Sequence, residues 1–276
     1  GQNPATPTGA STPAPAAPTP ALAAMVNGEA ILLDDYQQEI ARYELAQASL
    51  GLDPTQQGDY RAAVLESQIQ QKVLEQAAAQ AGFAVSDEEV NAKIDEVKAA
   101  RGGDEAFGNW LLANLYTLDQ FRAALRGQML SARLIEQMAA AVPTTAEHVH
   151  ARHILVGDEA AANDLLAQLA AGGDFAGLAS ANSLDTSTRF AGGALGWFPR
   201  GLLPVREVED AAFNLQPGEL SGVVRSSLGF HIVQTLERDP ARELSADTRL
   251  LLQQQTVEQW LQEQTSRANI QRIASP

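Results

Sequence analysis

The segment HARHILV at residues 150–156 decides the fold of this chain, together with AGGALGWF at 191–198 and LGFHIV at 228–233. The first and last segments are short apolar runs rich in Ile and Val, as β-strands are, and they carry His153 and His231. The middle segment contains a Gly-Gly pair, which is typical of a turn. The sequence therefore predicts two strands that each bear one histidine, with a glycine-rich turn between them.

Helical patterns fill the spaces between these segments. Asp158 and Asp174 each precede an apolar-periodic stretch, and an aspartate in that position caps the first turn of a helix. The expected elements of this region are a strand at 149–156, helices at 158–172, from 174 and around 206–215, and strands at 223–225 and 230–236. Strands and helices mixed in this order predict an α+β domain.

The composition excludes several classes of function. The chain has 276 residues and a formal net charge of -15, with a pI near 4.6, whereas nucleic-acid binding requires clustered Lys and Arg that neutralise phosphates. It contains no cysteine, which excludes disulfides and Cys-ligated metals. No apolar run reaches the roughly 18 residues that a membrane-spanning helix needs. We therefore expect no nucleic-acid partner and no transmembrane segment.

Residues 1–21 differ in composition from everything that follows. They are rich in Pro, Ala and Thr and carry almost no charge, so they cannot bury enough apolar surface to offset their ordering entropy. A disordered tether is expected. The chain begins at Gly1, and the leader is similar to that of bacterial surface lipoproteins just after their acylated cysteine. This similarity implies a lipid anchor upstream of Gly1, and a fusion linker is the alternative.

Residues 22–145 have the pattern of a mainly helical domain. Asn27-Gly28 lies between short apolar runs and predicts a tight turn. Ser86 and Thr117 each open a capping box, in which the side chain three residues later returns the hydrogen bond. Helices are expected from Asp34 to about Gly51, at 58–81, from Ser86 to Gly102 and from Thr117 to Pro143.

A long helix is expected at the C-terminal end, over 245–268. Its apolar stripe comprises Leu250, Leu251, Val257, Trp260 and Leu261. An exposed stripe of this kind promotes aggregation, so it requires a host, for which we expect the N-terminal helical domain. The predicted domains are a tether at 1–21, a helical domain at 22–145, an inserted α+β domain at 146–240 and a C-terminal helix at 241–276 that packs back onto the helical domain.

The α+β region resembles the parvulin-type (PpiC-like) peptidyl-prolyl cis–trans isomerases, or rotamases. Six ordered elements carry the resemblance: the His-Ile-Leu-Val strand at His153, Phe175 with Leu178-Ala179, Ser183-Leu184-Asp185, the turn at 192–196, the helix at 208–213 and the closing strand at 229–233. The resemblance implies the parvulin fold, in which the two histidines meet on neighbouring strands beneath an apolar cleft.

The resemblance also implies residue roles. His153, His231, Asp185 and Ser226 would form the catalytic polar cluster, and the proline pocket would be lined by Leu195, Leu203, Val208 and Phe230. Isomerisation breaks no bond, so neither a metal nor another cofactor is expected. Two alternatives stay open for these residues: the histidines could be hydrogen-bonded core residues of a strand, and Asp185 could simply cap the turn at Thr186-Ser187.

Several positions depart from the parvulin pattern. Ala194 replaces the aspartate of the glycine-rich turn, and Leu203 and Val208 replace a bulky Met and Phe of the proline pocket. His148, His150 and His153 are spaced like metal ligands. In a strand, however, the first two face opposite to His153, so we expect no metal site.

The regions around the parvulin-like domain are similar to those of exported SurA/PrsA-type foldases, in which a helical domain begins with a Val-Asn-Gly-Glu-like segment. Met25–Glu29 and the 245–268 stripe carry this similarity. It implies an extracytoplasmic peptidyl-prolyl isomerase and chaperone for unfolded or proline-containing exported polypeptides. The alternative is a chaperone or peptide-binding protein whose parvulin domain is weakly active or degenerate. A purely structural surface protein has no feature in its favour, and the sequence predicts no oligomeric state.

Overall fold

The structure is a computed structural model that describes residues 20–56 and 58–274. The predicted tether at 1–21 therefore lies almost entirely outside the described residues. Two compact units are present: one comprises the described residues up to Leu134 and from Trp260 onward, and the other comprises Ile135–Gln259. The end of one helix and the start of another thus fall with the second unit. The domain boundaries expected at 145/146 and 240/241 remain predictions.

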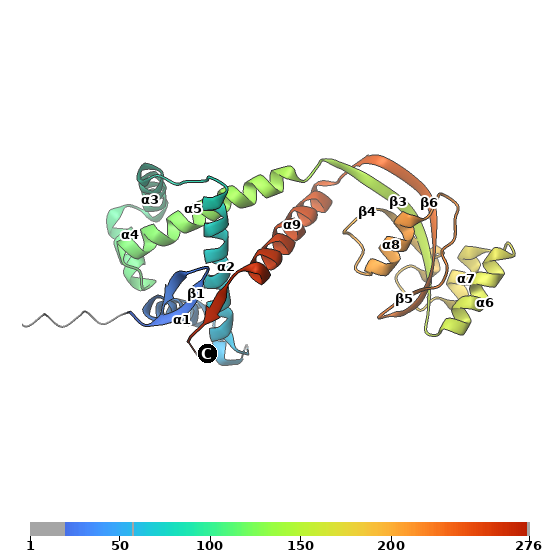
Figure 1. Cartoon of the computed structure of the whole chain (residues 1–276), viewed down its shortest axis with the longest axis horizontal. Coiled ribbons are helices and arrows are strands. Elements are labelled where there is room, and N and C mark those ends of the chain that lie inside the picture. Colours follow the sequence, from blue (N-terminus) through green and yellow to red (C-terminus); the bar gives the residue numbers. More distant parts are fainter. Residues whose placement is uncertain (1–19, 57, 275–276) are drawn as a thin grey trace, which may run out of the picture. The chain divides into compact units, whose positions relative to one another are not determined.

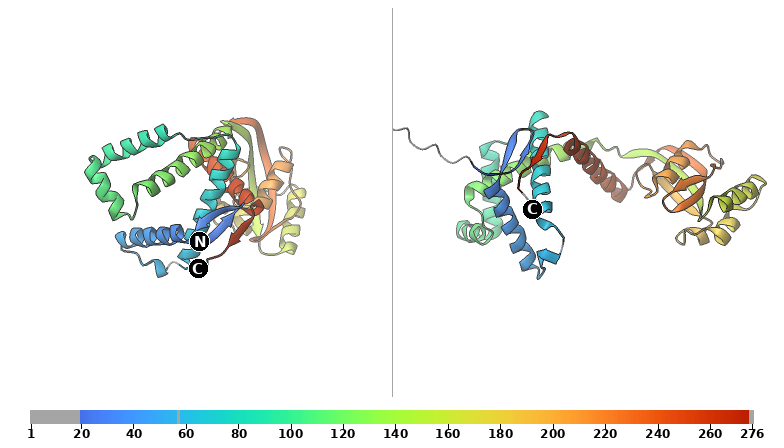
Figure 2. Two further views of the ribbon diagram at one scale, coloured as in Figure 1. Left: turned by 60° about the vertical axis from the view of Figure 1, so that its left-hand side comes forward. Right: turned by 60° about the horizontal axis from the view of Figure 1, so that its bottom comes forward.

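The first unit contains a three-stranded antiparallel sheet in the order β2-β1-β7, formed by β1 (Leu22–Val26), β2 (Glu29–Leu32) and β7 (Ile270–Arg272). Asn27 and Gly28 have φ values of 50° and 88° and connect β1 to β2, which confirms the predicted tight turn. In Figure 2, β7 (red) lies beside the N-terminal hairpin (blue). The two described ends of the chain therefore share one sheet.

The helices of the first unit agree with expectation except for one. The structure contains α1 (Leu33–Ser49), α2 (Tyr60–Gln80), α3 (Asp87–Arg101), α4 (Asp104–Ala113) and α5 (Leu118–Ala141), with a short 3-10 helix at Pro54–Gln56. Both predicted capping boxes form, from Ser86 with Glu89 and from Thr117 with Gln120. Helix α4 was not predicted, because it follows a glycine pair with positive φ and spans only 10 residues.

Helix α9 (Ala246–Arg267) occupies the predicted C-terminal position. Its end belongs to the first unit, where Leu261 packs against the core cluster of α1, α2 and β1. The expected stripe is only partly covered, since Leu250 and Leu251 are 54% and 38% exposed. The start of α9 instead bonds to the end of α5, where Gln253 Nε2 donates to the Ala139 carbonyl at 2.9 Å.

The second unit is built on a four-stranded antiparallel sheet in the order β4-β3-β6-β5 (Figure 1). Its strands are β3 (Thr145–Val156), β4 (Ala194–Pro199), β5 (Val224–Ser226) and β6 (Gly229–Glu243), and its helices are α6 (Glu159–Ala170), α7 (Phe175–Asn182) and α8 (Arg206–Asn214), with a 3-10 helix at Arg189–Ala191. The α+β prediction is confirmed. Strand β4 replaces what the sequence predicted only as a turn, and β3 and β6 are longer than expected.

Helices cover both faces of this sheet. On one face α6 and α7 pack against Ile154 and Ile232, and on the other α8 packs against Ala151 and Val233. Successive side chains of a strand point to opposite faces. His231 therefore shares the α8 face with Val233, and His153 shares it with Ala151.

Candidate active site

The two central strands bring His153 and His231 together on the α8 face of the sheet. In the β3–β6 register His153 lies opposite Val233, and Leu155 lies opposite His231, so the histidines are diagonal neighbours on one face. Their Nδ1 atoms are 3.3 Å apart, and the rings are nearly parallel, with centroids separated by 5.5 Å. Both side chains are buried. The contact that the resemblance implied is therefore present.

Asp185 joins the pair from the loop that follows α7. Its Oδ2 lies 2.7 Å from His153 Nε2 and accepts a hydrogen bond from the Thr188 hydroxyl at 2.5 Å. Its Oδ1 accepts from both the backbone N–H and the hydroxyl of Ser187. Asp185 thus caps the local turn and also contacts His153.

Ser226 completes the cluster at the turn between β5 and β6. Its Oγ lies 2.7 Å from His231 Nε2 and accepts from the Leu228 N–H at 3.0 Å. The Leu228 N–H leaves the hydroxyl proton free to donate to the imidazole. All four polar residues predicted from sequence are therefore linked in one chain of hydrogen bonds.

With both imidazoles neutral, one arrangement of protons satisfies this chain. The Asp185 carboxylate only accepts, so His153 donates from Nε2 and leaves its Nδ1 bare. His231 then donates from Nδ1 to that bare nitrogen, and its Nε2 accepts from the Ser226 hydroxyl. The tautomers follow from the hydrogen bonds. The result is a fixed, directional set of dipoles at the centre of the sheet.

The charge states of His231 and Asp185 have different physical causes. Burial, and secondarily the neighbouring His153, lowers the pKa of His231 from 6.5 to about 4, so His231 is neutral at physiological pH. Burial alone would raise the pKa of Asp185, but the hydrogen bonds from Ser187, Thr188 and His153 outweigh it and hold that pKa well below its usual range. The ionised Asp185 thus contacts His153, and His153 in turn contacts the uncharged His231.

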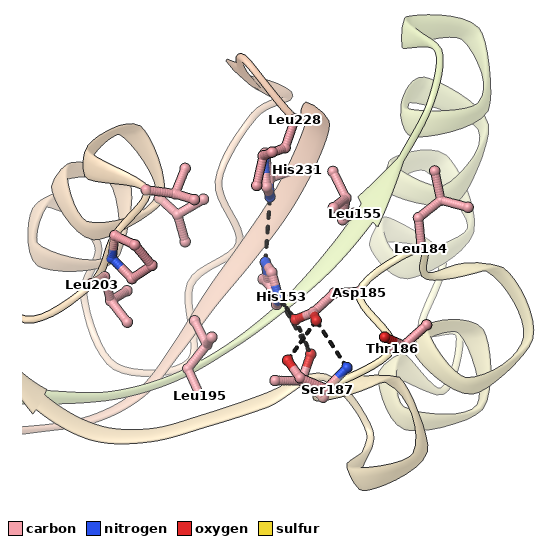
Figure 3. Close-up of a pocket in the computed structure, with 14 residues that line it drawn as sticks. His153, Leu155, Leu184, Asp185, Thr186, Ser187, Leu195, Leu203, Leu228 and His231 are labelled. Carbon is pink, nitrogen blue, oxygen red and sulfur yellow. Dashed lines mark hydrogen bonds and ion pairs between the residues drawn. The ribbon is translucent and has the colours of Figure 1, made fainter. Parts of the chain in front are cut away.

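An apolar cavity of about 410 Å³ opens over the histidine pair. Figure 3 shows Leu195 and Leu203 on one side of the pair and Leu155 and Leu184 on the other. Leu195, Leu203 and Val208, all predicted as pocket residues, line this cavity.

The prediction that Phe230 lines the pocket is wrong. Its side chain packs in the cluster beneath α6 and α7, with Ile154 and Ile232. The physical reason is the alternation of side chains along a strand, which sends Phe230 to the face opposite its neighbour His231.

Several lining residues were missed from sequence. Leu155 lies two residues after His153 on the same face of β3, and Leu184 and Leu228 line the rim while being 58% and 60% exposed. The strand period could have identified Leu155. No local signal marks Leu228, because only the fold of the β5–β6 turn brings it over His231.

The glycine-rich turn is braced by backbone rather than by side chain. The Gly193 carbonyl accepts from the His153 N–H at 2.9 Å, and the Gly193 N–H donates to the Thr188 carbonyl at 2.9 Å. With φ of +80°, a Cβ at Gly193 would lie 2.1 Å from the His153 carbonyl oxygen, so only glycine fits. These bonds hold the turn against β3 although Ala194 lacks the family's carboxylate.

The other two histidines of the H-x-H-x-x-H spacing do not converge on His153. His148 Nδ1 lies 2.9 Å from the Ala146 carbonyl, and His150 stacks on Trp197 with ring centroids 5.4 Å apart. No group of His, Asp and Glu side chains within residues 20–56 and 58–274 has the arrangement of a metal site.

Comparisons with known proteins agree with this geometry. Residues 137–239 match the PPIC-type PPIase domain family, and residues 8–135 match the family described as a SurA-like N-terminal domain. The foldase protein PrsA of Caldanaerobacter subterraneus subsp. tengcongensis is 31% identical over 237 residues, which cover 77% of this chain and 72% of the relative.

A second relative and a solved structure extend the match. The PrsA foldase of Geobacillus kaustophilus is 30% identical over 66% of this chain and 64% of its own length. The crystal structure of a peptidylprolyl isomerase (PrsA) from Bacillus cereus matches with a TM-score of 0.52 and 26% identity, covering 87% of this chain and 88% of that one. The chain therefore belongs to the PrsA foldase family and carries a PPIC-type PPIase domain behind a SurA-like N-terminal domain.

Proposed function

We propose that this protein is a peptidyl-prolyl cis–trans isomerase and folding chaperone that acts on unfolded, exported polypeptides. The observation that carries the proposal is the hydrogen-bonded chain of Asp185, His153, His231 and Ser226 at the wall of an apolar cavity. The names of the relatives, foldase and peptidylprolyl isomerase, agree with it. His153, Asp185, His231 and Ser226 are the proposed catalytic cluster, and Leu195, Leu203 and Val208 the proposed proline pocket.

The chemistry of the reaction suits such a site. An X-Pro amide rotates slowly because its C–N bond has partial double-bond character, with a barrier of about 18–20 kcal/mol. Rotation breaks this resonance without cleaving a bond, so no nucleophile is needed. An acceleration of about ten-thousandfold requires only about 5.5 kcal/mol of preferential binding to the twisted amide. An apolar clamp on the ring and fixed dipoles near the carbonyl can supply binding of this kind.

In this mechanism different parts of the cavity would contact different parts of the substrate. Leu195 and Leu203 would pack against the pyrrolidine ring, and Val208, which is 2% exposed, would line the bottom of the cavity. The histidine pair would then face the carbonyl of the preceding residue. Because its hydrogen bonds fix both tautomers, the cluster presents the same dipoles throughout rotation and need not reorganise as the amide twists.

A protease-coupled assay with a proline-containing peptide tests the catalytic part of the proposal. The wild-type chain should accelerate isomerisation, and the double variant His153→Ala with His231→Ala should lose at least about 100-fold of that activity. His150→Ala is a matched control, because His150 lies on the same strand but stacks on Trp197 away from the cavity. A wild-type rate equal to that of buffer would refute catalysis and favour the alternative, a chaperone with a degenerate parvulin domain.

The chaperone part of the proposal is tested separately with the full chain. Suppression of aggregation of a denatured client should persist in the double histidine variant, because the SurA-like region does not contain these residues. If neither wild type nor variant suppresses aggregation, the chaperone role is refuted.

The proposed location is outside the cytoplasm, since the family comprises foldases that we infer act on exported chains. None of the described helices is long and apolar enough to cross a membrane. A lipid anchor upstream of Gly1 remains a prediction, to be tested by mass spectrometry of the protein isolated from its source. An unmodified Gly1 amino terminus would contradict it.

A further inference from the structure

Glu209 is a buried carboxylate that the isomerase mechanism above does not use. It lies on α8, directly after the cavity residue Val208, and is only 7% exposed. Burial of an ionised carboxylate is expensive unless the group is paired or hydrogen-bonded. No ion pair joins Glu209 to an Arg or Lys within the part of the chain that the structure describes. Its burial therefore has to be explained by its hydrogen bonds.

Among the described residues, the hydrogen bonds to the Glu209 carboxylate come from the backbone of one turn. The Gly201 N–H lies 2.9 Å from each carboxylate oxygen, and the N–H groups of Leu202 and Leu203 each donate to Oε2 at 3.1 Å. Three consecutive backbone donors thus point at one side chain. Such a turn forms an anion-binding concavity, which here is filled by the protein's own carboxylate.

The turn held in this way leads directly into the wall of the cavity. Gly201 adopts a left-handed φ of +86°, which reverses the chain after β4, and the next residues, Leu203, Pro204 and Val205, line the cavity. Figure 3 shows Leu203 on the side of the histidine pair opposite Leu184. In the first turn of α8, Val208 therefore lines the cavity, and Glu209 binds the 201–203 turn that leads to its other lining residues.

We infer that Glu209 is the positioning residue of the proline pocket: it touches no reacting atom, but its carboxylate sets the conformation of the 201–203 turn and thereby the placement of Leu203 and Pro204. The inference rests on the proposed isomerase function. If Glu209 were only a stability element, its loss would lower the free energy of unfolding without separating binding from turnover. As a positioning residue it must affect proline binding in particular.

The test compares Glu209→Gln with Asp210→Asn in the full chain. The amide of Gln has the same shape as the carboxylate, but it replaces one acceptor oxygen by an NH2 group that faces backbone N–H donors. Asp210 is the matched control: it is the next residue of α8, yet its side chain is 50% exposed and pairs with Arg200 and Arg206 on the surface. Both changes remove one negative charge from the same helical turn.

Exchange NMR on an Ala-Pro peptide gives KM and kcat for each variant. Glu209→Gln should raise KM by roughly tenfold while kcat stays within about twofold of wild type, and Asp210→Asn should change neither. The backbone amide resonances of Gly201, Leu202, Leu203 and Val205 should shift, whereas the side-chain nitrogen resonances of His153 and His231 should not. Thermal unfolding of both variants is measured alongside.

The outcomes separate this inference from the proposed function. An inactive wild-type chain would refute the isomerase proposal itself. An active wild type with a folded Glu209→Gln variant of unchanged KM, or with kcat and KM affected alike, would overturn the positioning role alone. If Glu209→Gln does not fold, Glu209→Asp decides by the same comparison, because it keeps both oxygens but its side chain is one methylene too short to keep all the N–H groups in reach.

Discussion

Protonation of the buried His231 should lower the free energy of unfolding. His231 is fully buried, and burial lowers its pKa from 6.5 to about 4. Between pH 6.5 and 4 the unfolded chain therefore binds a proton at this imidazole, whereas the folded chain does not. The free energy of unfolding should therefore decrease as pH falls from 6.5 towards 4, by about 3 kcal/mol from this residue. Urea titrations across that range should show a shallower decrease for His231→Asn. Parallel profiles for the two proteins would contradict the assignment.

Asp185 determines the direction of the proton arrangement. In Asp185→Asn the amide NH2 can replace the oxygen that faces His153 Nε2, which would drive His153 to its other tautomer. To avoid two opposed N–H groups between the rings, His231 would then move its proton from Nδ1 to Nε2, facing the Ser226 hydroxyl. Isomerase activity should fall by roughly 10- to 100-fold. The side-chain nitrogen resonances of His153 and His231 should exchange their protonated positions. Unchanged resonances with unchanged activity would show that the carboxylate only caps its turn.

At the scale of the element, the glycine-rich turn before β4 depends on close approach to β3. Gly193→Ala would place a Cβ against the His153 carbonyl at a φ of +80°, whereas Gly196→Ala, at a φ of +76°, meets nothing within 4 Å. The first variant should lose roughly 2–4 kcal/mol of stability and much of its activity, and the second about 1 kcal/mol. Equal losses in urea unfolding would mean that backbone strain, and not the contact with β3, governs this turn.

Elements with a local start signal were predictable, whereas an element that forms only by pairing with a distant strand was not. The N-cap residues of α3 and α6 are Ser86 and Asp158, whose side chains accept the predicted backbone hydrogen bonds. These signals lie directly before the first residue of each helix. Strand β4 has no comparable local signal. It becomes a strand because it pairs with the edge of β3, with His148 opposite Pro199 at one end and Arg152 opposite Ala194 at the other.

At the scale of the whole molecule, the chain closes its first unit with its own C-terminal strand. Strand β7 pairs with β1, Ile270 packs against the core cluster of α1, α2 and β1, and the Asn269 N–H donates to Asn27 Oδ1. Truncation after Ala268 should therefore destabilise the first unit by about 2–4 kcal/mol and leave isomerase activity within about twofold of wild type. Removal of residues 275–276 alone is the control. A parallel loss of activity would show that the second unit depends on this sheet.

The amino-acid sequence by itself determined the helix starts marked by a capping residue, the α+β character of 146–240 and, through its resemblance to parvulins, the identity of His153, Asp185, His231 and Ser226 as one cluster. These features depend on residues close in the chain or on a motif whose order is preserved. Only the tertiary structure decided that Leu184 and Leu228 border the pocket and that Glu209 holds its wall. Each of these depends on strand register or on a turn that meets a distant helix. Such contacts are set by the packing of the whole domain, and no local pattern encodes them.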